Sequence, residues 1–189
     1  RKLNCLFLLM KKELFQEIEI PEGVEITLND GEVAVKGKEG ELKRTFNVAR
    51  IIFEKKDNKI IIGNKKATKT EKKLMNSITA HIKNMILGVQ NKFEYKLKIC
   101  FSHFPFTVDI QGNVATIKNF LGEKINRKCI IPKDADVKIN KQEITVTAIN
   151  KEIAGQAAAN FENATKIRNR DKRVFQDGIY ITEKNGKLM

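Results

Sequence analysis

The sequence is poor in the side chains that most enzymes and metal sites use. Its 189 residues include two histidines, three cysteines and no tryptophan. Cys5, Cys100 and Cys129 lie far apart, and no pair has the C-x-x-C spacing of a zinc site. Three cysteines cannot all pair within one chain. We therefore expect inert thiols in a reducing compartment, and no metal site.

Motifs of catalysis are also missing. The chain contains no G-x-x-x-x-G-K phosphate loop, no G-x-G-x-x-G after a strand and no G-x-S-x-G elbow. His81 lies beside the apolar side of a predicted helix, where a structural role is the better interpretation. His103, in "SHFPF", has no evident partner to orient it as a base. We expect neither catalysis nor a cofactor.

No hydrophobic run is long enough to span a membrane. The opening stretch "RKLNCLFLLM" contains a short apolar run, but charged residues follow it and no small-residue cleavage site does. It is therefore interpreted as neither a signal peptide nor a bilayer span, and we expect no membrane partner. Because the chain does not begin with Met, Met10 is a candidate natural start, with residues 1–9 as an upstream extension.

Positive charge is what the sequence has in abundance. It contains 36 Lys and Arg against 23 Asp and Glu, a formal net charge of +13. Residues 1–92 hold 19 cations and 12 acids, and residues 93–189 hold 17 and 11, so the excess is not confined to a tail. A folded body with this charge repels itself unless a polyanion neutralises it. Nucleic acid is the first candidate partner, ahead of an anionic membrane surface.

The hydrophobic pattern changes period along the first half. Apolar residues alternate in 24–28, 32–37 and 41–48, with turn residues between, which predicts antiparallel hairpins. A helix is then predicted from Lys69 to Val89, after the capping-box pair Thr68 and Glu71 and with Gly88 at its stop. Its apolar side is expected to be Leu74, Ile78, Ile82, Met85, Ile86 and Val89.

The second half repeats this order of elements. "FPFTVDIQGNVATIKNFLGEKINRK" can be laid over "IPEGVEITLNDGEVAVKGKEGELKR", and further strands and a helix over 151–167 follow. That helix places Ile153, Ala157, Phe161 and Ala164 on one face. We therefore predict an α+β fold, a tandem duplication of a small domain in which antiparallel β-sheets pack on one α-helix. The two domains are expected at 1–92 and 93–189.

One cluster of cations surrounds the predicted start of the first helix. Its members are Lys65, Lys66, Lys69, Lys72 and Lys73. Cations at this end oppose the helix dipole, so the cluster favours an external phosphate held by lysines and free N–H groups. A solvated lysine-rich turn is the alternative.

The segment "KIRNRDKRVFQDGIY", residues 166–180, carries the second cluster: Lys166, Arg168, Arg170, Lys172 and Arg173. A favourable interaction with the dipole at the C-terminal end of the helix accounts for Lys166 and Arg168, but not for the cations beyond the last turn. Phe175 is equally compatible with stacking on an unpaired base and with anchoring the segment to the domain. Lys184 follows on a polar tail.

A third candidate surface is "LGEKINRK", with Lys124, Arg127 and Lys128, of which Arg127 is the most clear of acids. Aromatic residues make up 7% of the chain, without the dense aromatic stripe of single-strand RNA readers. Recognition of shape and backbone charge is therefore predicted, rather than base-by-base reading.

Several of these segments together resemble a known family. The stretches "IPEGVEITLNDGEVAVKGKEGELKRTF", "AHIKNMILGV", "HFPFTVDI", "IKNFLGEK" and "RDKRVFQDGIYITEK" are similar, in order, to the universal sixth family of large-subunit ribosomal proteins. "NFLGEK" and the ending F-x-DGIY-x-x-EK are of the archaeal and eukaryotic type. The resemblance runs from about Met10 to Gly186. It departs at residues 1–9, in a shorter region between Ile52 and Lys65, and in a brief tail.

The resemblance implies a structural, RNA-binding role in the large subunit. Its expected partners are large-subunit rRNA near the sarcin–ricin loop, ribosomal proteins at the base of the acidic-protein stalk, and translational GTPases nearby. It implies a cytosolic ribosome, with assembly in the nucleolus. It also implies rRNA contacts by the cations of residues 166–173, with Gly178 setting the turn, and weaker ones by Lys118 and Lys124. The alternative is a free-standing RNA-binding or RNA-chaperone module of the same fold.

The expected start at Met10 can be tested by mass spectrometry of the protein from its source cells. We expect the N-terminal peptide to begin at or just after Met10. Abundant peptides that contain Leu6–Leu9 would contradict this start.

Overall fold

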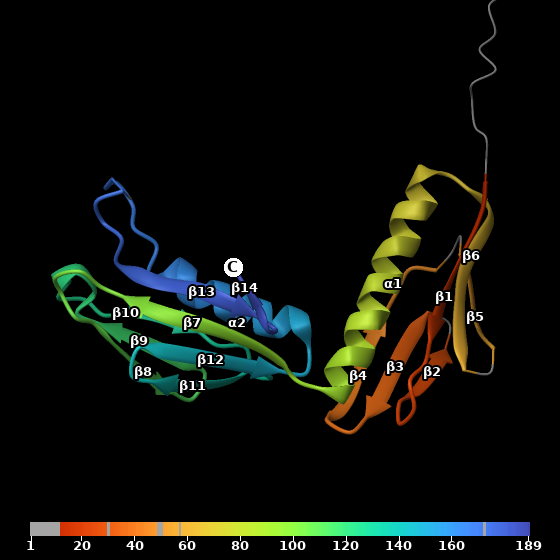
Figure 1. Cartoon of the computed structure of the whole chain (residues 1–189), viewed down its shortest axis with the longest axis horizontal. Coiled ribbons are helices and arrows are strands. Elements are labelled where there is room, and N and C mark those ends of the chain that lie inside the picture. Colours follow the sequence, from red (N-terminus) through yellow and green to blue (C-terminus); the bar gives the residue numbers. More distant parts are fainter. Residues whose placement is uncertain (1–11, 30, 49–50, 57, 172) are drawn as a thin grey trace, which may run out of the picture. The chain divides into compact units, whose positions relative to one another are not determined.

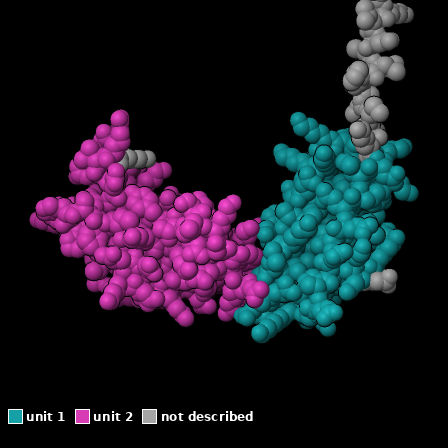
Figure 2. Space-filling view, viewed as in Figure 1, with its two compact units in different colours: residues 1–90 teal, residues 91–189 magenta. Residues whose placement is uncertain are grey.

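The computed structural model describes residues 12–29, 31–48, 51–56, 58–171 and 173–189. The chain divides into two compact units, residues 1–90 and residues 91–189 (Figure 2).

The first unit contains two three-stranded antiparallel sheets and one helix (Figure 1). The elements are β1 (Lys12–Glu19), β2 (Glu25–Asn29), β3 (Glu32–Gly37), β4 (Gly40–Thr45), β5 (Ile52–Lys56), β6 (Lys59–Ala67) and α1 (Lys69–Gln90). One sheet has the order β1-β6-β5 and the other β2-β3-β4. Helix α1 packs on β1 and β6 of the first sheet and on β3 and β4 of the second.

The second unit repeats this plan and adds two strands (Figure 1). Its elements are β7 (Phe93–Cys100), β8 (Thr107–Gln111), β9 (Val114–Lys118), the 3-10 turn η1 (Phe120–Gly122), β10 (Arg127–Ile130), β11 (Asp136–Asn140), β12 (Glu143–Ala148), α2 (Lys151–Ala164), β13 (Gly178–Lys184) and β14 (Lys187–Leu188). The sheets are β10-β9-β8 and β11-β12-β7-β13-β14.

The two units match down to the register of their strands. The order β5-β6-β1 returns as β11-β12-β7. The N–H of Ile20 donates to the carbonyl of Asn58 at 2.9 Å, and the N–H of Ile99 donates to that of Gln142 at 2.8 Å. The predicted α+β duplication is therefore confirmed at the level of single hydrogen bonds.

Helix α1 follows the predicted period, with two corrections. Met75, 1% exposed, occupies the core position expected for Leu74, which is 37% exposed, because the buried face is rotated by one residue at that turn. Gly88 does not end the helix, which continues to Gln90 with Gly88 buried inside it. The Glu71 carboxylate accepts a hydrogen bond from the Thr68 N–H at 2.9 Å, as a capping box requires.

Helix α2 begins as expected and ends early. The Asn150 side chain caps it by accepting from the N–H of Glu152 at 2.9 Å. Ala154, Ala157 and Ala158 are fully buried, so the helix lies close on its sheet around the buried ring of Phe161. The helix ends at Ala164, not at Ile167, because the chain turns away to form the segment that leads to β13.

The rotated face of α1 gives a test in two adjacent residues. Met75→Ala should lower the free energy of unfolding of the first unit by about 2–5 kcal/mol, because it leaves a cavity in the core. Leu74→Ala should lower the free energy of unfolding by less than about 1 kcal/mol, since the Leu74 side chain is partly exposed to solvent. Denaturant unfolding of both variants checks this, and equal costs would contradict the assigned face.

Candidate nucleic-acid interface

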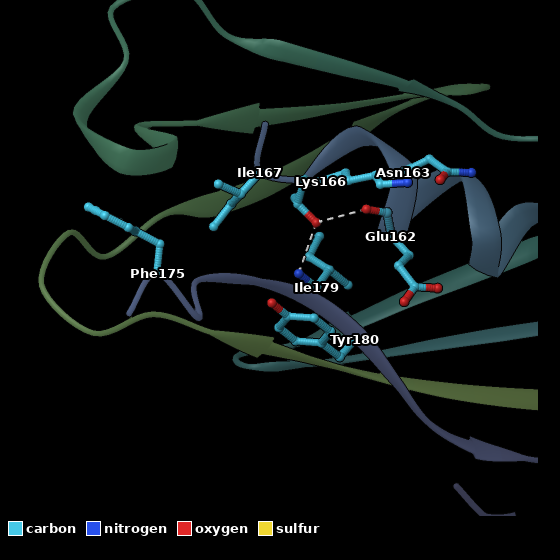
Figure 3. A pocket seen from close by; sticks show the side chains of 8 residues that line it. Glu162, Asn163, Lys166, Ile167, Phe175, Ile179 and Tyr180 are labelled. Atoms are coloured by element: carbon cyan, nitrogen blue, oxygen red, sulfur yellow. Dashed lines mark hydrogen bonds between the residues drawn. The ribbon is translucent and has the colours of Figure 1, made fainter. Parts of the chain in front are cut away.

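The cationic segment 166–177 is held at both ends by one buried side chain. Thr165 is 3% exposed. Its hydroxyl oxygen accepts from the Ile179 N–H at 2.9 Å and lies 3.3 Å from the carbonyls of Phe161 and Glu162. The dashed lines in Figure 3 run to Glu162 and Ile179. The end of α2 and the start of β13 are therefore tied together, and the segment between them is a closed loop.

Asp171 organises the tip of this loop. Its carbonyl accepts from the N–H groups of Val174 at 3.1 Å and Phe175 at 2.9 Å, and its carboxylate accepts from the Arg173 N–H at 2.9 Å. Asn169 takes a left-handed conformation with φ 59°, which asparagine tolerates. Asp171, the acid at the tip of the loop, thus shapes the turn more than it neutralises the cations.

The described cations of the loop point their charge into solvent. Lys166, Arg168 and Arg170 are exposed, and the Arg173 side chain is 93% exposed with its Nε 3.6 Å from Asp171. Within the described residues, Lys166 and Arg168 take part in no ion pair. Lys172, also expected here, lies outside the residues described.

Phe175 packs against the core of the second unit and is covered from outside by Arg170. It is half-buried among the core residues, and the Arg170 guanidinium carbon lies 4.9 Å from its ring centroid. Of the two interpretations left open by the sequence, this arrangement favours anchoring, because the ring face toward Arg170 is already in a cation–π contact.

Arg127 is not clear of acids, which corrects the expectation from sequence. Its Nε and Nη2 donate to the Glu123 carboxylate at 2.8 and 2.6 Å, and its Nη1 donates to the carbonyls of Ala164 at 3.0 Å and Lys166 at 3.4 Å. It also lies 4.4 Å above the ring of Phe120. Arg127 therefore caps the C-terminal end of α2. It positions the cationic loop more than it offers a free charge.

The other residues of the second unit that were expected to contact rRNA lie in different surroundings. Lys118 pairs with Asp109 at 2.8 Å on the surface, while Lys124 and Lys128 are exposed. Lys184 ends β13 and is half-buried. Gly178 does not set a turn, because it is the first residue of β13, opposite Cys100. A Cβ there would come 3.2 Å from the Tyr180 ring, so glycine makes room for that ring.

The first cluster lies where the sequence put it, around the start of α1. Lys65 and Lys66 are exposed at the end of β6, and three exposed lysines, Lys69, Lys72 and Lys73, follow in the first turns of the helix. Glu71, 8% exposed, is the acid of the first turn, and its carboxylate is engaged by Thr68. A bound phosphate at this cluster stays a prediction.

A pocket of about 360 Å³ opens beside the loop of the second unit (Figure 3). Its lining includes Lys166, Phe175 and the ring of Tyr180, which is 41% exposed. Burial raises the pKa of Tyr180, so its hydroxyl stays protonated near neutral pH. Sequence reasoning missed this pocket and Thr165, since both depend on how the chain after α2 returns to the end of that helix.

Asp177 is a further residue that the sequence did not single out as structural. It is 5% exposed, and its carboxylate accepts from the backbone N–H of Ser102 and lies 3.4 Å from the Ser102 hydroxyl. The end of the cationic loop is thereby fixed to the chain that follows β7.

No group in the described part of the chain is arranged as a catalytic centre. The Nδ1 of His81 lies 3.2 Å from the guanidinium of Arg44, and the exposed His103 packs edge-on against Phe104. Burial raises the pKa of the Cys129 thiol to about 11, which makes it unreactive. Among these residues no group of three or more His, Cys, Asp and Glu could hold a metal, and no helix is long and apolar enough to cross a membrane.

These features define a class: a basic protein of two repeated α+β units that presents exposed cations from the loop 166–177 and from the start of α1. The chain matches the family described as ribosomal protein L6 over residues 20–92 and 104–178, and it belongs to that family. It is therefore a structural ribosomal protein and not an enzyme, as predicted.

Relatives of similar length are found in archaea. The large ribosomal subunit protein uL6 of Methanobrevibacter smithii is 46% identical over 169 residues, which cover 89% of this chain and 95% of the relative. That of Methanococcus vannielii is 43% identical over 174 residues, covering 92% and 96%. That of Methanosarcina mazei is 42% identical over 175 residues, covering 93% and 99%. The resemblance seen in the sequence is confirmed.

The Arg127–Glu123 pair gives a pH-dependent test. Hydrogen bonds from Arg127, helped by its charge and by that of Arg170 but opposed by burial, lower the pKa of Glu123 from its usual 4.5. A carboxylate with a lowered folded-state pKa stabilises the fold above its unfolded pKa, and this contribution is lost as the pH falls through the folded value.

Arg127→Ala should therefore lower the free energy of unfolding of the second unit by roughly 1–3 kcal/mol at pH 7. The difference from the unchanged protein should be constant well above pH 4.5 and should shrink as the pH falls below 4.5 and Glu123 becomes protonated. Denaturant unfolding at several pH values measures both effects. Lys128→Ala, a change at the exposed neighbour, is the control and should leave stability within about 0.5 kcal/mol. An equal cost in both variants would refute the capping role.

Proposed function

We propose that this protein binds rRNA of the large ribosomal subunit near the sarcin–ricin loop and the base of the stalk, and helps to shape the surface where translational GTPases dock. The family gives the ribosomal role. The position within the subunit rests on the resemblance of the C-terminal segment to the archaeal and eukaryotic type.

The observation that carries the proposal is the closed loop 166–177. Four described cations, Lys166, Arg168, Arg170 and Arg173, are presented on a loop whose two ends are fixed by Thr165 and whose helix end is capped by Arg127. Fixing the loop before binding reduces the conformational entropy that phosphate contacts must overcome. Arginine guanidinium groups donate bidentate hydrogen bonds that match phosphate geometry.

A free-standing RNA-binding or RNA-chaperone protein is the alternative. Neighbouring ribosomal proteins would be partners only if the protein is part of the large subunit. Sucrose-gradient sedimentation of a cell lysate in high-salt buffer separates the two. We expect stoichiometric migration with large subunits and polysomes. A position in the light fractions would favour the free-standing protein. Assembly in the nucleolus stays a prediction for a source cell that has one.

The loop can be tested by removing three of its charges. Arg168→Ala, Arg170→Ala and Arg173→Ala together should leave the fold intact, because all three side chains lie outside the core. Removal of each cation that binds a phosphate should reduce the salt dependence of RNA binding, by about 0.9 in slope on duplex RNA if it behaves as duplex DNA does. The variant should leave subunits at a lower salt concentration than the unchanged protein, and factor-dependent GTP hydrolysis should slow.

A matched control removes the same charge elsewhere in the second unit. Lys133→Ala, Lys138→Ala and Lys141→Asn change three exposed cations away from the loop, and asparagine suits the φ of 53° at Lys141. We expect this control to behave like the unchanged protein. Equal retention on subunits and equal GTP hydrolysis in all three proteins would show that the loop cations are only a solvated face.

A further inference from the structure

The edge of β1 is open where its counterpart in the second unit is covered. In the sheet β11-β12-β7-β13-β14, strand β13 pairs with the outer edge of β7. In the sheet β5-β6-β1, no strand among the described residues pairs with the outer edge of β1. The chain thus carries, in its own second unit, an example of how this edge can be covered.

The register of the ladders fixes which residues correspond. Ile18 pairs with Ile60 as Leu97 pairs with Ile144. Glu17 and Glu19 therefore correspond to Lys96 and Lys98, which lie in the part of β7 that pairs with β13. The acidic pair and the basic pair occupy the same two positions of a repeated sheet, with opposite charge.

The backbone of β1 is oriented to receive a strand at this place. The N–H of Ile20 points to β6, because it donates to the carbonyl of Asn58. Backbone groups alternate in direction along an antiparallel strand, so the N–H and C=O of Glu19 and Glu17 point to the open edge. Unpaired edge groups of this kind are the template for addition of another strand.

A hollow of about 670 Å³ lies along the same residues. It is lined by Glu17–Pro21 of the β1 edge and by Lys83, Ile86, Leu87 and Gln90 of α1. Leu87 is 52% exposed. In the second unit, the strand at this edge places Ile179 opposite Ile99 and buries it fully. Apolar side chains two positions apart on an added strand would enter the hollow in the same way.

Charge identifies the kind of strand that fits. Residues 13–35 contain seven acids and no lysine or arginine, in a chain whose net charge is +13. Such a stretch repels RNA phosphates. In the second unit, Lys96 of β7 pairs with Glu183 of β13 at 2.9 Å. With Glu17 in the place of Lys96, a cation on the added strand would restore this pairing with the two signs exchanged.

Glu17 and Glu19 of β1 share one cation of their own sheet. The Nζ of Lys59 on β6 lies 3.0 Å from the Glu17 carboxylate and 3.9 Å from that of Glu19. One lysine balances one of the two negative charges, and both carboxylates are exposed. A second cation, brought by the added strand, would balance the other.

We infer that the β1 edge at Glu17–Ile20 receives an extended basic segment of a neighbouring protein of the large subunit, as an added antiparallel strand with apolar residues two positions apart and lysine or arginine between them. This inference rests on the proposed function for the identity of the neighbour. The strand's backbone bonds to Glu17 and Glu19, and its cations face their carboxylates.

The test places a photo-cross-linking residue, p-benzoylphenylalanine, at Glu19 in the full chain, and irradiates salt-washed large subunits. We expect one cross-link to a lysine- or arginine-rich extended segment of another large-subunit protein, mapped by mass spectrometry. The same residue at Glu32, an exposed acid of β3 in the same acidic stretch, is the control and should not reach that segment.

A second variant separates strand addition from simple proximity. Glu19→Pro removes one outward N–H and leaves the bonds between β1 and β6 in place, since proline is tolerated at a sheet edge. With the cross-linking residue at Glu17, the added Glu19→Pro change should abolish the cross-link while the protein still sediments with large subunits.

Each other outcome overturns the inference. A cross-link to rRNA, to a second copy of this chain or to the chain's own residues 1–11 would show a different occupant, and no cross-link would show an uncovered edge. A cross-link that survives Glu19→Pro would show proximity without strand pairing. Absence of the protein from the subunits would instead refute the proposed function.

Discussion

The position of the cationic loop depends on one buried hydroxyl, that of Thr165. It accepts from the Ile179 N–H while lying against the last carbonyls of α2, and it thereby holds the helix end next to the start of β13. Arg127 and Asp177 add two further ties, to the end of α2 and to the chain after β7. Anchoring at several points lets a loop of like charges stay ordered although its cations repel one another.

Duplication followed by divergence explains how one plan serves two kinds of surface. Both units bury a helix against an antiparallel sheet with the same register. In the second unit α2 ends at Ala164, and the freed chain becomes the cationic loop and the strand β13. In the first unit α1 continues to Gln90, and the corresponding sheet edge is acidic. The cations of the first unit gather instead at the start of α1.

Local sequence patterns predicted the helices and strands, but they did not predict the contacts between residues far apart in the sequence. Both helices, the hairpins and the duplication could be read from periodicity and turn residues, since these depend on neighbours in sequence. The pairing of β13 with β7 joins residues about 80 positions apart, and no local pattern encodes it. Arg127 was misjudged for the same reason, because its geometry with Glu123 and with the end of α2 exists only in the folded unit.

Directed hydroxyl-radical probing tests the central claim most directly. An iron chelate would be tethered to an Arg168→Cys variant in large subunits, with Cys5 and Cys100 replaced by serine and the buried Cys129 left in place. We expect rRNA cleavage confined to the sarcin–ricin loop and adjoining helices, and none there from a chelate at Lys138→Cys. Cleavage elsewhere from residue 168, or the same pattern from both sites, would contradict it.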